Sequence, residues 1–264
     1  MTQPSDGAGD PHRRVTGLVP TLVAIVILLA VWQVAAMLVG HDIILVTPAR
    51  VVVTLVGLLP TASFWATIVH SLVRVVLGFL LAFVFGLSLA WLASTSRWAA
   101  ALTATTMRLI RSIPVVSFII LLLIWADATW VGLWVSFLMV LPVIYANTEE
   151  GFSTRDAKIL DMALVFGFTP ARRWWAITAP GLMPYLIAAT RVGFGLAWKA
   201  GVSAEVIGMT RGSIGERLYQ AKIFLSTADL FAWTAVIVAA SYLCEILALW
   251  GLRRGQAALG RYAA

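Results

Sequence analysis

Long apolar stretches separated by short polar segments run through the whole chain. A helix needs about 17 to 25 apolar residues to cross roughly 30 Å of hydrocarbon, and several stretches meet this requirement. They cover residues 18–40, 64–94, 101–126, 130–146, 180–207 and 230–251. Arg108, Arg111 and Pro114 interrupt the third, so its membrane part is expected to begin near Ile113. The pattern predicts an all-α integral membrane protein with about six transmembrane helices.

The composition supports this interpretation. Of the 264 residues, 61% are apolar and 12% are charged, whereas soluble domains average about 45–50% and about 25%. An ordinary soluble globule is therefore excluded, and no polar block is long enough for a second domain. We expect a single transmembrane domain over residues 18–252, between a flexible cytoplasmic tail at 1–17 and a basic cytoplasmic tail at 253–264. The stretch 18–40 is too long for a signal-peptide core and is expected to be a retained span.

The basic residues predict the orientation. If the N-terminus is cytoplasmic, 12 of the 19 Lys and Arg residues fall inside and 4 fall outside, as the positive-inside rule requires. Both termini of this multi-pass protein are then expected on the cytoplasmic side of the cell membrane. The net charge of +7 does not indicate a nucleic-acid partner, because the basic residues flank apolar stretches instead of forming one exposed stripe.

The longest segment predicted to be cytoplasmic, residues 147–179, has the pattern of two short helices. Ser153 or Thr154 is expected to cap the first, with Asp156 completing a capping box. Gly167 is expected to end it, because glycine adopts the left-handed conformation that closes many helices.

Thr169 and Pro170 then predict the start of a second helix over residues 170–178, as its cap and first residue. Pro180 is expected to close this helix where the next span begins. From these features alone, an amphipathic helix lying among lipid headgroups is an open alternative.

A sequence resemblance favours a protein-binding role for the segment. Asp161-Met162-Ala163, three residues, Gly167, nine residues, Ile177, one residue and Ala179-Pro180 resembles the cytoplasmic signature of binding-protein-dependent ABC importer permeases. That signature reads Glu-Ala-Ala, three residues, Gly, nine residues, Ile, one residue, Leu-Pro. Every interval matches, although Asp161, Met162 and Ala179 replace Glu, Ala and Leu. Residues 71–79, 111–114 and 202–205 are similar to the nitrate, sulfonate and taurine group, and the resemblance covers roughly residues 47–254.

The resemblance implies a type I ABC importer permease fold and a set of partners. These are a second copy of the chain in a homodimer, a cytoplasmic ABC ATPase dimer, an external solute-binding protein and membrane lipid. ATP and magnesium would be bound by the ATPase partner, and no cofactor by this chain. The residues implied to couple the permease to the ATPase are Asp161, Ala163, Gly167, Ile177 and Pro180.

Charged residues within the fifth stretch are candidates for the translocation path, because charges in hydrocarbon usually face water or a protein interior. Arg191 and Lys199 share roughly one helix face, whereas Glu205 points elsewhere. Arg191 and Lys199 could line an anion path. The alternative is structural, with Arg191 near the inner interface and Glu205 paired with another span, such as the one carrying Arg74.

The types and spacing of other residues argue against several competing functions. The single Cys244 allows neither an intrachain disulfide nor a cysteine metal site. Lysine is never followed by Ser or Thr as in a phosphate loop, and the three histidines form no His-Glu-x-x-His motif. Catalytic and metal-binding residues are therefore not expected. An ion-coupled secondary transporter is the main rival hypothesis, and a vitamin precursor is an alternative cargo to a small anion such as nitrate, sulfonate or taurine.

Overall fold

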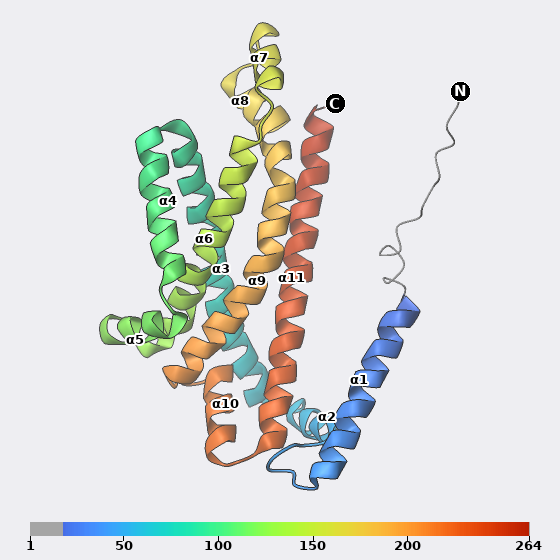
Figure 1. The fold of residues 1–264 in the computed structure, drawn as a ribbon. Helices are drawn as coiled ribbons and strands as arrows, with labels where there is room; N and C mark the ends of the chain where they lie inside the picture. The colour runs from blue at the N-terminus through green and yellow to red at the C-terminus, as the bar shows by residue number, and fades with distance from the viewer. Residues whose placement is uncertain (1–17, 264) are drawn as a thin grey trace, which may run out of the picture.

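The computed structural model describes residues 18–263, which form helices joined by short turns (Figure 1). The helices are α1 (Leu18–Val39), α2 (Pro48–Leu58), α3 (Ala62–Thr95), α4 (Arg97–Ser112), α5 (Val115–Trp125), α6 (Val131–Ser153), α7 (Ala157–Val165), α8 (Pro170–Arg173), α9 (Ala179–Ile207), α10 (Ile214–Ile223) and α11 (Thr227–Ala263). The tail predicted over residues 1–17 lies outside the described residues. Over residues 253–263, where a basic tail was expected, α11 continues as helix.

The core is built on α3, α6 and α9, and glycines set the distance between the first two. A Cβ atom at Gly78 of α3 would overlap the carbonyl oxygen of Leu133 on α6. A Cβ at Gly86, two turns further along, would lie 2.9 Å from the side chain of Ile144. Both approaches are closer than real Cβ atoms tolerate. Gly78 and Gly86 therefore allow α3 and α6 to pack closely.

Helix α9 lies between α6 and α11 and runs antiparallel to both (Figure 1). Near one end of α6, the Ser136 hydroxyl donates to the Ala197 carbonyl at 2.9 Å. Near the other end, the Thr154 and Tyr185 hydroxyls lie 2.8 Å apart. These contacts fix the register of α9 along the whole length of α6.

The number of membrane spans differs from the prediction. Four runs of the described chain are long and apolar enough to cross a membrane, namely Val19–Val39, Ala62–Thr95, Ala128–Ser153 and Thr227–Leu259. Helix α9 has 29 residues, and it is less apolar because Arg191, Lys199 and Glu205 lie within it. Helices α4 and α5 qualify only as a pair, which would make five.

The third predicted span, residues 101–126, is not one straight helix. Helices α4 and α5 meet at an angle of 99°. The break follows from Pro114, because a proline disfavours helical geometry at the preceding residue, and Ile113 is extended with φ −83° and ψ 128°. The apolar part does begin near Ile113, but the 11 residues of α5 reach only about 17 Å at 1.5 Å per residue. Helix α5 alone is too short to cross the hydrocarbon.

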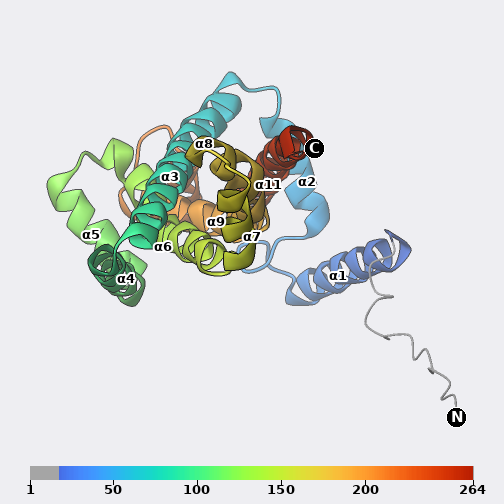
Figure 2. The ribbon, with the colours of Figure 1, turned by 90° about the horizontal axis from the view of Figure 1, so that it is seen from above.

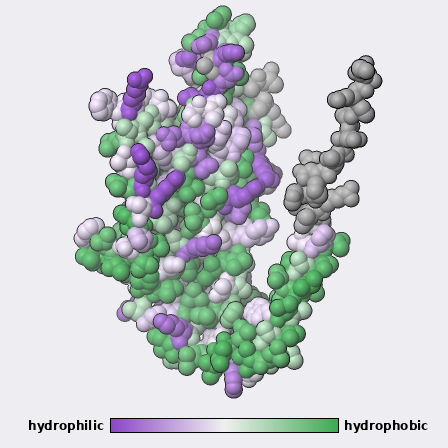
Figure 3. Space-filling model, in the orientation of Figure 1, coloured by the Kyte–Doolittle hydropathy of each residue, from purple (hydrophilic) through white to green (hydrophobic). Residues whose placement is uncertain are grey.

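The surface separates into two regions. Figure 3 shows apolar residues around α1, α2 and α5, whereas hydrophilic residues gather towards the α7 end of the bundle. Helix α1 stands apart from the core when the molecule is seen from above (Figure 2). Only 6% of its most apolar stretch is buried against the rest of the protein. Such exposed apolar helices are stable in lipid, where their backbone groups are satisfied internally.

Candidate functional site

The segment formed by α7 and α8, here called the α7–α8 knob, projects beyond the ends of α6 and α9 (Figure 1). Its first helix is capped by Asp156, whose carboxylate accepts a hydrogen bond from the Lys158 amide at 2.8 Å. Ser153 and Thr154 do not cap it, contrary to the prediction. Their hydroxyls instead donate to the Glu150 carbonyl, both at 2.9 Å, and thereby close α6.

Gly167 makes the turn between the two helices. Its φ is +69°, in the left-handed region that glycine enters without strain. The Gly167 amide donates to the Leu164 carbonyl at 3.0 Å, and the Phe168 amide donates to the Ala163 carbonyl at 2.9 Å. A Cβ added at Gly167 would meet nothing within 4 Å. The predicted left-handed turn is confirmed, and glycine is required there by conformation and not by space.

The second helix begins as predicted but does not end as predicted. The Thr169 hydroxyl accepts from the Arg172 amide at 3.3 Å, with Pro170 in the first turn. Beyond Arg173 the chain passes through a π-helical turn, Trp174–Thr178, directly into α9. A proline ring crowds the carbonyl four residues earlier. Here the wider turn, in which the Ala179 amide donates to the Trp174 carbonyl, lets the helix continue past Pro180.

Part of the knob's surface is apolar. Ala163 is buried, at 1% exposure, whereas Val165 and Phe166 are 86% and 73% exposed. Asp161 is also exposed. Ile177 and Pro180 are partly buried at the junction with α9. Exposed apolar groups gathered on a projecting element mark an interaction surface.

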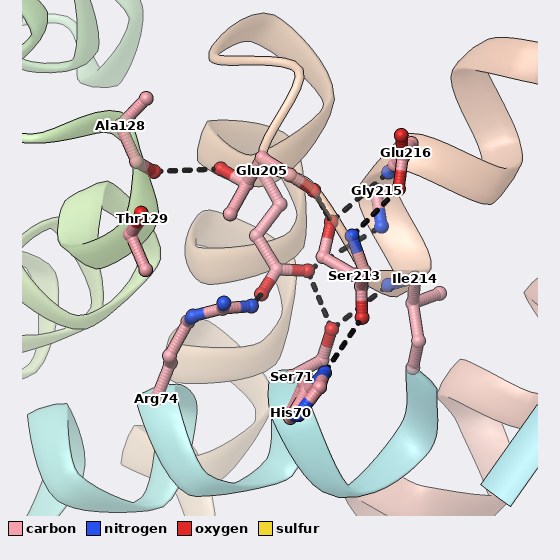
Figure 4. Close-up of polar contacts among 12 residues, drawn as sticks. His70, Ser71, Arg74, Ala128, Thr129, Glu205, Ser213, Ile214, Gly215 and Glu216 are labelled. Atoms are coloured by element: carbon pink, nitrogen blue, oxygen red, sulfur yellow. Dashed lines mark hydrogen bonds and ion pairs between the residues drawn. The ribbon is translucent and has the colours of Figure 1, made fainter. Parts of the chain in front are cut away.

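A second polar site lies near the opposite end of α9, around the carboxylate of Glu205 (Figure 4). Glu205 is fully buried, at 0% exposure. Its Oε1 lies 3.4 Å from Nη1 of Arg74 on α3. Its Oε2 accepts from the Ser71 hydroxyl at 2.7 Å and from the Gly215 amide of α10 at 3.3 Å. The carboxylate therefore joins α3, α9 and α10.

Further contacts hold α10 and the turn before it close to this carboxylate. The Ser71 hydroxyl also accepts from the Ile214 amide at 2.9 Å. A Cβ at Gly215 would overlap the Cβ of Glu205, so only glycine allows this approach. His70 Nδ1 lies 3.3 Å from the Gly212 carbonyl oxygen, and Figure 4 shows these groups converging from three helices. Sequence reasoning did not identify Ser71 or Gly215 as partners of Glu205.

The three charged candidates of α9 do not form one site. Arg191 Nε lies 3.8 Å from Glu245 Oε1 of α11, and Lys199 is exposed. Glu205 is buried against α3 and α10. Its ion pair with Arg74 is the pairing named in the structural alternative, while a translocation path along Arg191, Lys199 and Glu205 stays a prediction.

The helical bundle, its projecting knob and the sequence together define a membrane-spanning transport subunit. Residues 78–254 match the family described as binding-protein-dependent transport system inner membrane component. The chain belongs to this family.

Individual relatives are transport permeases. The chain is 28% identical to the putative aliphatic sulfonates permease SsuC of Bacillus subtilis, over 84% of this chain and 81% of the relative. It is 27% identical to the taurine permease TauC of Escherichia coli, over 92% and 88%. It is 26% identical to the nitrate import permease NrtB of Synechococcus elongatus, over 76% of each chain. These relatives are thus permeases for sulfonates, taurine and nitrate, the group that the sequence resembles.

A solved structure supports the fold. The crystal structure of an amino acid ABC transporter with histidines superimposes with a TM-score of 0.56. The match covers 79% of this chain and 97% of that chain at 17% sequence identity. The type I permease fold predicted from the resemblance is confirmed.

Proposed function

We propose that two copies of this chain form the translocation path of an ATP-driven importer for a small anion of the sulfonate, taurine or nitrate type. The relatives that transport sulfonates, taurine and nitrate support this cargo class. The importer receives its solute from an external binding protein and its energy from a separate ATPase dimer. The knob lies on the cytoplasmic side, together with both termini.

The observation that carries the proposal is the continuity between the knob and α9. The exposed Val165 and Phe166 fit a groove of the ATPase, and Gly167 sets the angle between the two short helices. The helical run from Pro170 through the π-helical turn to Ile207 has no break in its backbone. A displacement of the knob therefore moves α9 along its length. Asp161, Ala163, Gly167, Ile177 and Pro180 are the coupling residues of this mechanism.

Lys199 is the proposed contact for the anion. Arg191 already faces the carboxylate of Glu245, which offsets part of its charge. Within residues 18–263, no carboxylate lies within ion-pair distance of Lys199, so its ammonium group is free to attract an anionic solute. Trp198, the neighbouring residue, is buried at 1% exposure and belongs to the packing of α9.

The coupling assignment is tested with Gly167→Val in liposomes that contain the permease, its ATPase and its binding protein. A β-branched residue at a positive φ costs roughly 1–3 kcal/mol of strain, so the knob is expected to lose its shape. ATP hydrolysis stimulated by the binding protein should fall, and uptake of labelled taurine, ethanesulfonate or nitrate should fall with it.

Gly40→Val is the matched control, because Gly40 has φ +68° and equally open surroundings but lies between α1 and α2. It should leave coupling intact. Gly167→Asn should retain most activity, because asparagine tolerates the left-handed conformation. Normal coupling in Gly167→Val would refute the assignment. Uptake driven by an ion gradient without ATP would instead identify a secondary transporter, and uptake confined to aromatic vitamin precursors would change the cargo class.

A further inference from the structure

A pocket of about 250 Å³ lies at the end of the bundle opposite the knob. Its walls come from the turn between α2 and α3, from α10 and from the start of α11. Phe64 and Trp233 form a buried apolar floor, at 3% and 4% exposure. Thr61 and Ser63 line the pocket with exposed side chains. The pocket is therefore a socket with an apolar base and a polar, accessible rim.

Arg217 of α10 places a positive charge at this socket. The guanidinium Nε is buried and has no hydrogen-bond partner within the described chain. No carboxylate of residues 18–263 forms an ion pair with Arg217. A buried donor without an acceptor is unfavourable, so Arg217 lacks a partner that an anionic group would supply.

Two nearby carboxylates each accept a hydrogen bond from a group other than Arg217. Asp229 also lines the pocket, but its Oδ2 accepts from the Ser226 hydroxyl at 2.6 Å. It lies in the first turn of α11, where the helix dipole favours a negative charge. Glu216 accepts from the Gly212 amide at 2.6 Å. Helix α10 otherwise carries the basic residues Arg217 and Lys222, so the surface around the socket complements an acidic partner.

Helix α10 is joined firmly to the core by the buried Glu205 carboxylate, which accepts from the Gly215 amide. Glu205 belongs to the helix that leads from the knob. A partner bound at the socket is therefore mechanically connected, through α10 and α9, to the surface proposed for the ATPase.

We propose that this socket receives an acidic side chain of the external solute-binding protein, whose carboxylate pairs with Arg217. The inference rests on the proposed function, in which this end of the bundle is external. A planar guanidinium binds a carboxylate through two parallel hydrogen bonds, and an apolar floor beneath such a pair is typical of interface hot spots. A transported anion fits this socket less well, because neither α6 nor α9 contributes to its walls.

The test measures the affinity of the co-purifying binding protein for the assembled transporter in nanodiscs. Arg217→Glu should weaken binding at least about tenfold, because it replaces an attractive buried contact with a repulsive one. Arg217→Lys should retain part of the affinity. Ser63→Trp, which fills the mouth of the socket without a charge change, should weaken binding as well. Arg211→Glu is the matched control, since Arg211 is exposed at the same end but does not line the pocket.

Restoration of binding to Arg217→Glu by an acid-to-lysine change in the binding protein would identify the partner residue. Equal loss in Arg217→Glu and Arg211→Glu, or no loss in either, would overturn the proposal. So would an Arg217-dependent thermal shift with taurine alone, which would indicate a free-anion site, or with phosphatidylglycerol vesicles, which would indicate a headgroup site. If no binding protein or ATPase co-purifies with the native chain, the proposed importer function is refuted, and with it the docking role of the socket.

Discussion

Removal of the Glu205 carboxylate is expected to leave a buried positive charge without compensation. In Glu205→Ala, Arg74 stays in the bundle at 7% exposure and loses its ion pair. The Ser71 hydroxyl and the Gly215 amide lose their acceptor at the same time. The packing of α10 against α9 is therefore expected to be destabilised first.

The size of the effect follows from the geometry. Breaking a buried ion pair from one side costs about 3–5 kcal/mol, because the remaining charge is desolvated without a partner. The Arg74–Glu205 contact of 3.4 Å is longer than the roughly 2.7–2.9 Å of the strongest charged hydrogen bonds, which favours the lower end of this range. We expect Glu205→Ala to lower the free energy of unfolding by about 3 kcal/mol.

The double variant Arg74→Met/Glu205→Met separates charge from packing. Replacing both members of a buried pair with apolar residues is often neutral or stabilising, so the double variant should be more stable than Glu205→Ala. Equilibrium unfolding in mixed detergent micelles, followed by tryptophan fluorescence, measures all the variants on one scale.

The exposed ion pair of Asp42 and Arg50 provides the control. Its side chains are 49% and 62% exposed, and surface pairs contribute about 0–1 kcal/mol. Asp42→Ala should therefore change stability by less than about 1 kcal/mol. The reasoning about this buried pair is wrong if Glu205→Ala is no more destabilising than Asp42→Ala. It is also wrong if the double variant loses as much free energy of unfolding as Arg74→Met and Glu205→Met lose in sum.

Two further predictions concern packing and cargo. Gly86→Leu should destabilise the bundle by about 1–3 kcal/mol through overpacking, because its Cβ would lie 2.9 Å from Ile144. Gly195→Leu should not destabilise the bundle, because a Cβ at Gly195 meets nothing within 4 Å. Equal effects of the two variants in the same unfolding assay would contradict the packing argument. Lys199→Ala should raise the KM for anion uptake about tenfold or more, the magnitude of one lost charged contact, while Lys199→Arg retains most of the affinity. Unchanged uptake kinetics in Lys199→Ala would assign Lys199 a structural role.

Local signals in the sequence predicted much of the knob. Gly167 and the pair Thr169-Pro170 influence the backbone only within about one helical turn along the chain. Their conformations could therefore be predicted without knowledge of the helices packed around them. The same reasoning misplaced the cap of α7, because Ser153, Thr154 and Asp156 are all competent caps. Only the point at which α6 ends decides among them.

The sequence by itself determined the elements that depend on composition and short-range chemistry: apolar helices of membrane length, the helix start at Thr169 and Pro170, and the turn at Gly167. Tertiary structure decided which groups meet. Ser71 and Arg74 lie more than 130 positions from Glu205 along the chain, and nothing local selects one span as the partner of that carboxylate. The direction of α5 after Pro114, the continuation of the helix past Pro180 and the socket at Arg217 likewise depend on packing between helices. Helix formation is governed by interactions a few residues apart, whereas the geometry of a site is set by whichever distant segments the core brings into contact.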